Sequence, residues 1–181
     1  MDNRPAIERA AWRRCAAAVL LLCAACAGAQ ADDTLELRVK SAFLFNFAKF
    51  VSWPPPKLQG ASDPILYCVL DREPLAGALQ EALSGKSVDN HPLLLRRVAR
   101  AEEMRDCHIA YLGAADGGRL PALAGSSVLT VYDGDAPLRA GIVRFYLDER
   151  KVRFEINAAG AEREGLQVSS RLLGVASVIR E

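Results

Sequence analysis

The sequence predicts an α/β fold: a mixed, mostly parallel sheet with an antiparallel edge hairpin and helices on both faces. Apolar runs, which are typical of strands covered on both faces, alternate with helical segments as far as Tyr132. Two strands of alternating polar and apolar residues then surround a charged turn, which indicates a hairpin. One amphipathic helix rich in phenylalanine precedes all of these elements.

The first predicted element is a helix over residues 40–53, which holds four of the chain's six phenylalanines. At about 100° per residue its apolar side chains fall on one broad arc, which we expect to seat the rest of the domain. The arc carries Phe43, Leu44, Phe47, Phe50 and Val51. Pro54 should end the helix, because proline disfavours helical geometry at the preceding residue and has no amide hydrogen to donate.

Two residues break the pattern of this helix. Phe45 lies on the polar arc, where it is either a singly exposed aromatic or a contact for another chain. Lys40 lies on the apolar arc. Its stem can follow the apolar surface with the ammonium in water, or the ammonium can be buried beside a carboxylate of the sheet.

The elements that follow alternate in type. Asp71, after the first strand, is a candidate helix N-cap. The segment 114–125 is predicted to be a loop with a short helical turn. Helices are predicted at residues 73–83 and 99–105, and strands at 65–70, 91–98, 107–113 and 128–132.

The last third of the chain has a different rhythm. Strands at residues 142–147 and 152–157 form a hairpin, which we expect at the edge of the sheet because one of its faces is polar. A short helical linker over 158–163 and a final helix over 169–180 complete the predicted fold.

The amino-terminal 31 residues resemble a secretory signal. Four arginines precede an apolar run from Cys15 to Cys26, and a small-residue cleavage site ends at Ala31. Residues 27–29 offer a competing site; an uncleaved anchor and a lipoprotein acylated at Cys26 are further alternatives. The run is shorter than the ~20 residues that a membrane-spanning helix needs. We therefore expect a periplasmic protein with its signal peptide removed and a single domain over residues 32–181.

The charge of the chain argues against a nucleic-acid partner. The whole chain has 23 Lys and Arg against 22 Asp and Glu. Cleavage after Ala31 removes four arginines and two acidic residues, which leaves 19 basic against 20 acidic residues. A nearly neutral domain without a basic stripe lacks the electrostatic footprint of a nucleic-acid-binding protein.

Two cysteines, Cys68 and Cys107, remain after that cleavage. In an oxidising compartment such a pair can form one disulfide, and two buried free thiols are the alternative. A zinc site is less favoured, because zinc takes three or four protein ligands and this pair supplies two.

The sequence shows no constellation that would mark an enzyme, a metal site or a cofactor site. His108 lies in an apolar strand, where a hydrogen-bonded core histidine is the expectation. Asp71, Gly113 and Asp133 follow predicted strands at the carboxyl edge of the sheet, where α/β folds bind ligands. Without a binding fingerprint, a capping or turn role is preferred for these three residues, so the sequence predicts neither catalytic residues nor a cofactor.

Five motifs, in order and at compatible spacing, resemble the YfiR family of exported regulators. The resemblance covers essentially the whole predicted mature chain. The motifs are Val39-Lys-Ser-Ala-Phe-Leu-Phe-Asn-Phe-Ala-Lys-Phe-Val-Ser-Trp-Pro54, Cys107-His-Ile-Ala-Tyr-Leu112, Val128-Leu-Thr-Val-Tyr-Asp133, Val152-Arg-Phe-Glu-Ile-Asn157 and Leu166-Gln-Val-Ser-Ser-Arg-Leu-Leu173.

The resemblance implies a periplasmic protein that represses an inner-membrane diguanylate cyclase by binding the cyclase's periplasmic sensor part. Repression lowers cyclic di-GMP and biofilm formation, and an OmpA-like outer-membrane lipoprotein relieves it. The resemblance also implies a homodimer and a disulfide between Cys68 and Cys107. The second cysteine pair of the characterised member has no counterpart here, so we expect no two-stage redox response.

A repressor of this kind needs an exposed apolar patch that prefers the inactive cyclase, and it needs no catalytic site. Candidate partner-binding residues are Phe45 and Trp53 near the first helix, and Phe154, Ile156 and Leu166 at or after the hairpin. For the last three, ordinary core packing is the alternative. A second hypothesis is a periplasmic small-ligand-binding sensor module that acts on another membrane receptor, such as a histidine kinase.

Overall fold

The computed structural model of the chain describes residues 33–134 and 137–179. The predicted signal peptide, residues 1–31, lies outside the described residues. The chain divides into the units Met1–Glu36 and Leu37–Glu181, and the second unit holds the α/β fold. Among the described residues, no helix has both the length and the hydropathy that crossing a membrane requires.

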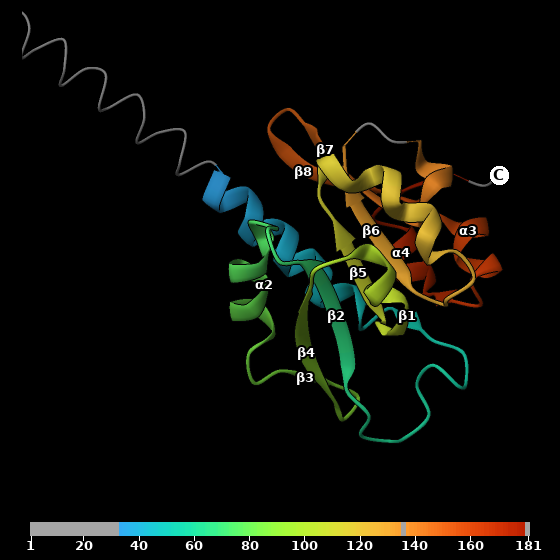
Figure 1. The fold of residues 1–181 in the computed structure, drawn as a ribbon. Coiled ribbons are helices and arrows are strands. Elements are labelled where there is room, and N and C mark those ends of the chain that lie inside the picture. Colours follow the sequence, from blue (N-terminus) through green and yellow to red (C-terminus); the bar gives the residue numbers. More distant parts are fainter. Residues whose placement is uncertain (1–32, 135–136, 180–181) are drawn as a thin grey trace, which may run out of the picture. The chain divides into compact units, whose positions relative to one another are not determined.

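In the described part of the chain, eight strands form one mixed sheet in the order β10-β8-β7-β6-β5-β2-β4-β3 (Figure 1). Adjacent strands from β4 to β7 pair in parallel, as do β8 and β10, whereas the β7–β8 and β3–β4 pairs are antiparallel. This confirms the predicted mixed, mostly parallel sheet. The strands are β2 (Ile65–Leu70), β3 (Ser87–Val88), β4 (His91–Val98), β5 (Ile109–Leu112), β6 (Leu129–Asp133), β7 (Val143–Asp148), β8 (Lys151–Asn157) and β10 (Ser177–Ile179).

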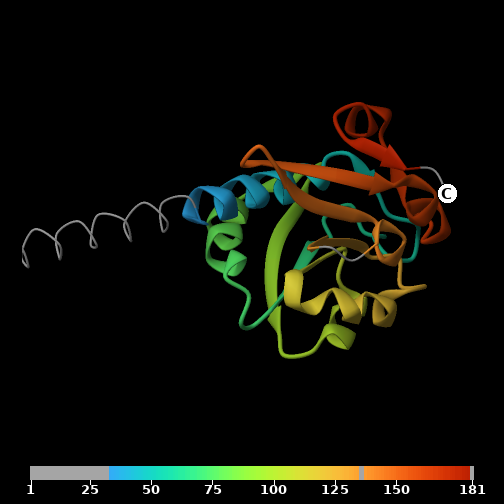
Figure 2. The ribbon, with the colours of Figure 1, turned by 90° about the horizontal axis from the view of Figure 1, so that it is seen from above.

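Helices cover both faces of this sheet, as predicted. Helical residues 37–47 and α2 (Leu75–Leu83) pack on one face, where Leu44, Phe47 and Leu79 are fully buried. The 3₁₀ helices η1 (Ala101–Asp106) and η2 (Ala114–Leu123) pack on the other face. In Figure 2, the blue helix and the yellow η2 lie on opposite sides of the strands. The sheet therefore separates two hydrophobic clusters.

The first helix ends earlier than the sequence predicts. Helical geometry stops at Phe47, and after a turn the short strand β1 (Val51–Ser52) pairs antiparallel with β9 (Gln167–Val168). The amide of Ser169 also donates to the carbonyl oxygen of Phe50 at 2.8 Å. The backbone before Pro54 is thus held by a distant segment, and proline does not end the helix.

The predicted final helix over residues 169–180 is wrong. The helix α4 (Ser170–Leu173) makes a single turn, and β10 then joins the sheet in parallel beside β8. Gly174 follows the short helix, and Val178 and Ile179 are β-branched residues that favour a strand when a free sheet edge is available. As a consequence, the β7–β8 hairpin is not the outermost part of the sheet, because β10 covers β8.

Smaller elements follow the sequence more closely. The predicted linker helix is α3 (Ala158–Arg163), whose N-cap Asn157 accepts a hydrogen bond from the amide of Gly160. The predicted helix over 99–105 is the 3₁₀ helix η1, and another 3₁₀ turn, η3 (Leu138–Ala140), precedes β7. The predicted N-cap role of Asp71 is wrong: α2 begins after Pro74, which makes no side-chain cap.

Candidate functional site

The carboxyl edge of the parallel strands is occupied by a buried ion pair. Asp133, at the end of β6, accepts a hydrogen bond from Lys40 Nζ at 2.7 Å and another from the hydroxyl of Tyr111. The side chains of Lys40 and Asp133 are 8% and 17% exposed. Lys40 is therefore the buried ammonium beside a sheet carboxylate, which was one of the two alternatives for this residue.

Further charges at the same edge are paired with one another. Asp116, buried in η2, accepts from Arg119 Nε at 2.8 Å and from Arg72. Burial raises the pKa of Glu73, and Asp133 and Asp116 add to the effect. A Cβ atom on Gly113 would lie 2.5 Å from Glu73 Oε2, so a larger residue there would require the Glu73 carboxylate to move. Because these groups satisfy one another, the edge resembles a structural network more than a ligand site.

Cys68 and Cys107 form a disulfide with a Cα–Cα distance of 6.1 Å, which confirms the predicted pairing. Cys68 lies in β2 and Cys107 just before β5, and these strands are neighbours in the sheet. Both residues are buried in the cluster on the η1 and η2 side. Arg96 Nη2 donates to Cys107 Sγ at 3.0 Å. The bridge therefore lies inside the protein.

Trp53 and His108 form a buried pair on the opposite sheet face from the disulfide. Trp53 Nε1 donates to the carbonyl oxygen of His108 at 3.0 Å, and the two rings meet edge to face. His108 Nδ1 accepts from the amide of Leu66 at 3.0 Å, so Nε2 carries the proton and donates to the carbonyl oxygen of Lys57. Burial lowers the pKa of His108. His108 is thus a hydrogen-bonded core residue, as the sequence predicts.

Most of the predicted partner-binding residues lie in the core. Trp53, Phe154, Ile156 and Leu166 are all buried, so ordinary packing, the alternative left open for the hairpin set, describes their environment. Phe45 alone is half-buried, with Lys49 Nζ 4.2 Å from its ring centroid. A partner contact at these five residues stays a prediction. Of the five, Phe45 has the most exposed surface for such a contact.

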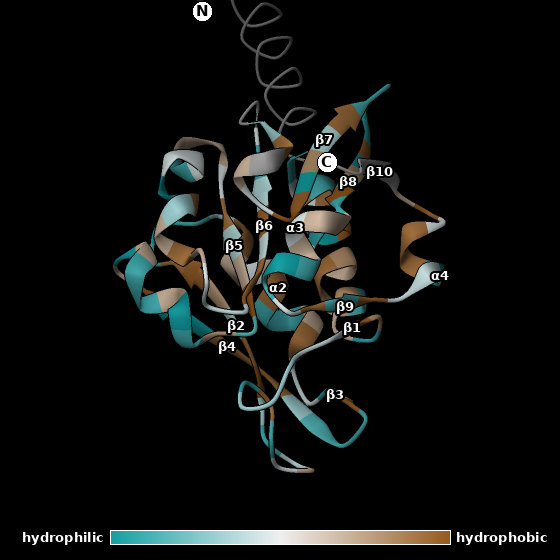
Figure 3. Cartoon of the chain, turned by 90° about the vertical axis from the view of Figure 1, so that its right-hand side faces the viewer, coloured by the Kyte–Doolittle hydropathy of each residue, from teal (hydrophilic) through white to brown (hydrophobic). Residues whose placement is uncertain are grey.

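A groove that the sequence did not suggest lies at the free end of the β7–β8 hairpin. We call it the hairpin groove; its volume is about 560 Å³. Val175, on its rim, is 73% exposed. In Figure 3, hydrophobic colouring appears on both β7 and α4. The lining residues are Phe43, Tyr146, Asp148, Val152, Arg153, Phe154, Gly174, Val175 and Ala176.

The hairpin groove could not be predicted from the sequence, because one of its walls is formed by the path of the chain after α4. Residues 174–176 form that wall only because the chain leaves α4 after one turn and enters β10. A continuous helix over 169–180 would place these residues elsewhere. The alternation in β8 could have indicated Val152 and Phe154 as one face, but not that their outer end stays open.

A metal centre has no support in the described segments 33–134 and 137–179, where no three His, Cys, Asp or Glu side chains gather as ligands. In the comparison with known proteins, a family model described as YfiR/HmsC-like matches residues 37–177. The matched range begins with the unit that holds the α/β fold and covers nearly all of it. No curated protein matches the chain.

Proposed function

The chain belongs to the YfiR/HmsC-like family, and from this we propose that it is a periplasmic negative regulator of a membrane diguanylate cyclase. It binds the periplasmic sensor part of the cyclase and holds the enzyme in its inactive state. Repression lowers cyclic di-GMP and biofilm formation. The protein itself transforms no substrate, and its effect needs only a higher affinity for the inactive cyclase than for the active one.

The observation that best supports a protein-binding role is the hairpin groove. Its floor is aromatic, since the ring centroids of Phe43 and Phe154 lie 5.1 Å apart in an edge-to-face arrangement. Val175 on its rim and Leu147 on the hairpin are 73% and 55% exposed. Exposed apolar side chains around an open groove are typical of a surface that another protein covers. We propose that an apolar segment of the cyclase's sensor part occupies it.

Two further partners belong to the proposal. An OmpA-like outer-membrane lipoprotein relieves repression by sequestering the regulator, and the regulator acts as a homodimer. Competition between the lipoprotein and the cyclase for one surface would explain relief without any chemical step. Phe45, which lies half-buried on the first helix, is a candidate for the contact between the two copies of the homodimer.

The groove can be tested with a matched pair of exposed apolar residues. Val175→Asp should weaken binding to the purified periplasmic part of the cyclase at least about tenfold, because a carboxylate would be buried against an aromatic floor. Leu94→Asp is the control, since Leu94 is 49% exposed on β4 and does not line the groove. Equal affinity of the two variants would contradict the groove as the contact surface.

The regulatory role has a separate test in cells. In a strain that expresses a membrane cyclase with a periplasmic sensor, deleting the gene should raise cyclic di-GMP and biofilm. Restoring the wild-type gene, but not the Val175→Asp variant, should return both to their starting levels. An unchanged cyclic di-GMP level after deletion in such a strain would refute the proposed function.

A further inference from the structure

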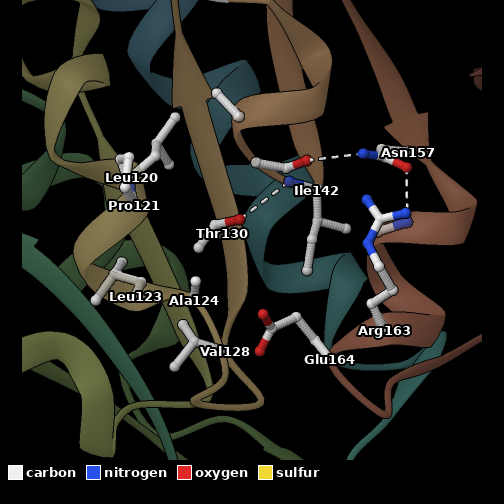
Figure 4. Close-up of a pocket in the computed structure, with 13 residues that line it drawn as sticks. Leu120, Pro121, Leu123, Ala124, Val128, Thr130, Ile142, Asn157, Arg163 and Glu164 are labelled. Atoms are coloured by element: carbon white, nitrogen blue, oxygen red, sulfur yellow. Dashed lines mark hydrogen bonds between the residues drawn. The ribbon is translucent and has the colours of Figure 1, made fainter. Parts of the chain in front are cut away.

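A cavity lies away from the hairpin groove, between η2, the beginnings of β6 and β7, the end of β8, and α3 (Figure 4). Its volume is about 160 Å³. An engineered apolar cavity of about 150 Å³ is known to hold benzene, so this one has room for a body of that size. None of its lining residues belongs to the hairpin groove.

The inner wall of the cavity is apolar. Leu120, Leu123, Val128 and Ile142 line it, and all four are buried. In Figure 4, the leucines reach in from η2 on one side, while Arg163 and Glu164 reach in from α3 on the other. A ligand would therefore place an apolar body against η2 and a polar group toward α3.

Two buried polar side chains in the wall have hydrogens left to donate. Asn157 Oδ1 accepts from the amide of Gly160 at 2.6 Å, while Asn157 Nδ2 makes a long contact of 3.4 Å with the carbonyl oxygen of Gly141. Thr130 Oγ1 accepts from the amide of Ile142 at 3.0 Å, which leaves its hydroxyl hydrogen for another acceptor. Both side chains are more than nine-tenths buried.

Of the two charged side chains that line the cavity, Arg163 is free to pair with a ligand and Glu164 is not. Glu164 is engaged, because its two carboxylate oxygens accept from the amides of Gly125 at 2.8 Å and Ser127 at 3.0 Å. Arg163 is exposed and makes no ion pair within the described residues. The cavity therefore offers a guanidinium at its mouth and hydrogen-bond donors inside. Both features suit an anionic oxygen group.

We propose that this cavity binds a small apolar monocarboxylate, of about the size of benzoate or a short branched-chain acid. The apolar body packs against Leu123, Val128 and Ile142, and the carboxylate pairs with the Arg163 guanidinium. An amino acid fits less well, because Glu164, the carboxylate among the lining residues, is already held by two backbone amides and is less available to a ligand's ammonium. The proposal rests on the cavity alone and is independent of the cyclase.

Benzoate is the probe for the first test. Titrated into the purified protein, it should cause saturable shifts of the backbone amide signals of Val128, Ile142 and Gly160 in NMR spectra. Arg163→Gln should weaken this binding about tenfold or more, because a charge-assisted hydrogen bond is lost. Arg171→Gln, another exposed arginine but one outside the cavity, should bind as the wild type does. Benzamide, which is neutral, should bind the wild type as weakly as benzoate binds Arg163→Gln.

A second variant separates occupancy of the cavity from attraction to the arginine. Ala124 is exposed at the cavity wall, and Ala124→Phe should block the space and abolish binding of both benzoate and benzamide. The proposal is overturned if millimolar benzoate and isovalerate give no saturable shift. It is also overturned if Arg163→Gln or Ala124→Phe binds as the wild type does, or if the shifts map to the hairpin groove. None of these results would bear on repression of the cyclase.

Discussion

Lys40 is a residue whose break with the local pattern reports a tertiary contact. A lysine on the apolar arc of a helix is costly to bury unless an anion meets it. Asp133 supplies that anion from β6, and the hydroxyl of Tyr111 supports it. The pair ties the first helix to the carboxyl edge of the sheet.

Replacing Lys40 with methionine should lower the free energy of unfolding by about 3 kcal/mol, because Asp133 would stay buried without its counter-ion. Urea-induced unfolding measures the change. Lys49→Met is the control, because Lys49 is exposed and its hydrogen bond to Asn46 lies at the surface. Loss of that hydrogen bond should lower the free energy of unfolding by less than about 1 kcal/mol. Similar losses in the two variants would show that the buried pair does not stabilise the fold.

His108 should make stability depend on pH. Burial lowers its pKa below the ordinary value of 6.5, and protonation of Nδ1 would break the hydrogen bond from Leu66. Below pH 6.5 the unfolded chain therefore binds a proton that the folded chain does not, so the free energy of unfolding falls as the pH drops from 7 toward the folded pKa.

NMR titration of the ring checks this directly. His91→Gln leaves His108 as the only histidine, so the remaining ring signal is unambiguous. Its midpoint should lie below 6.5, and the free energy of unfolding of this variant should decrease between pH 7 and pH 6. A midpoint at or above 6.5 would contradict the argument.

The sequence predicted burial better than exposure at the level of residues. The apolar arc of the first helix and the alternation in β8 placed Leu44, Phe47, Phe154 and Ile156 on the apolar faces of their elements. All four are buried. It could not show that Val175 lies exposed on the rim of a groove. Exposure of an apolar residue depends on which distant segment fails to cover it, and local periodicity does not contain that information.

Among the elements, β2 and β5 show how a covalent bridge follows from strand order. Cys68 and Cys107 are 39 residues apart in sequence, yet their strands are adjacent. The bridge therefore closes a loop that contains α2, β3, β4 and η1. In the chain-entropy view, closing a loop of this length restricts the unfolded state far more than the folded one.

Replacing both cysteines with alanine should lower the free energy of unfolding by about 4 kcal/mol. Urea-induced unfolding without reductant compares the double variant with the wild type. Wild-type protein unfolded and refolded in reductant should match the double variant. If the two disulfide-free forms were as stable as the bridged protein, the disulfide would have no stabilising role.

The elements that were predicted correctly share a local signal, and the missed ones lack it. Ile65–Leu70 and His91–Val98 occur with the predicted bounds, because continuous apolar runs between turn residues identify buried strands. Among the missed strands, β1, β9 and β10 have two or three residues each. Their strand geometry comes from a partner elsewhere in the chain, and a window of neighbouring residues does not reveal it.

At the scale of the whole unit Leu37–Glu181, the sheet keeps the hairpin groove and the disulfide apart. The hairpin groove lies over the cluster that contains Phe154, whereas the disulfide lies in the cluster beneath η1 and η2. The cavity beside α3 shares Leu120, Leu123 and Val128 with the disulfide's cluster. A change in redox state should therefore affect the groove only through the stability of the fold.

The disulfide should consequently behave as a structural bridge and not as a sensor. Its sulfurs are shielded, since Cys68 and Cys107 are 1% and 0% exposed, and a reductant must reach a sulfur to attack it. Millimolar dithiothreitol should reduce the native protein only as fast as the protein opens, and sub-denaturing urea should accelerate the reaction. Alkylation followed by mass spectrometry measures the rate.

In cells, the double alanine variant should repress the cyclase normally once its amount is matched to the wild type. Fast reduction that urea does not accelerate, or lost repression at matched amounts, would instead make the bridge a switch.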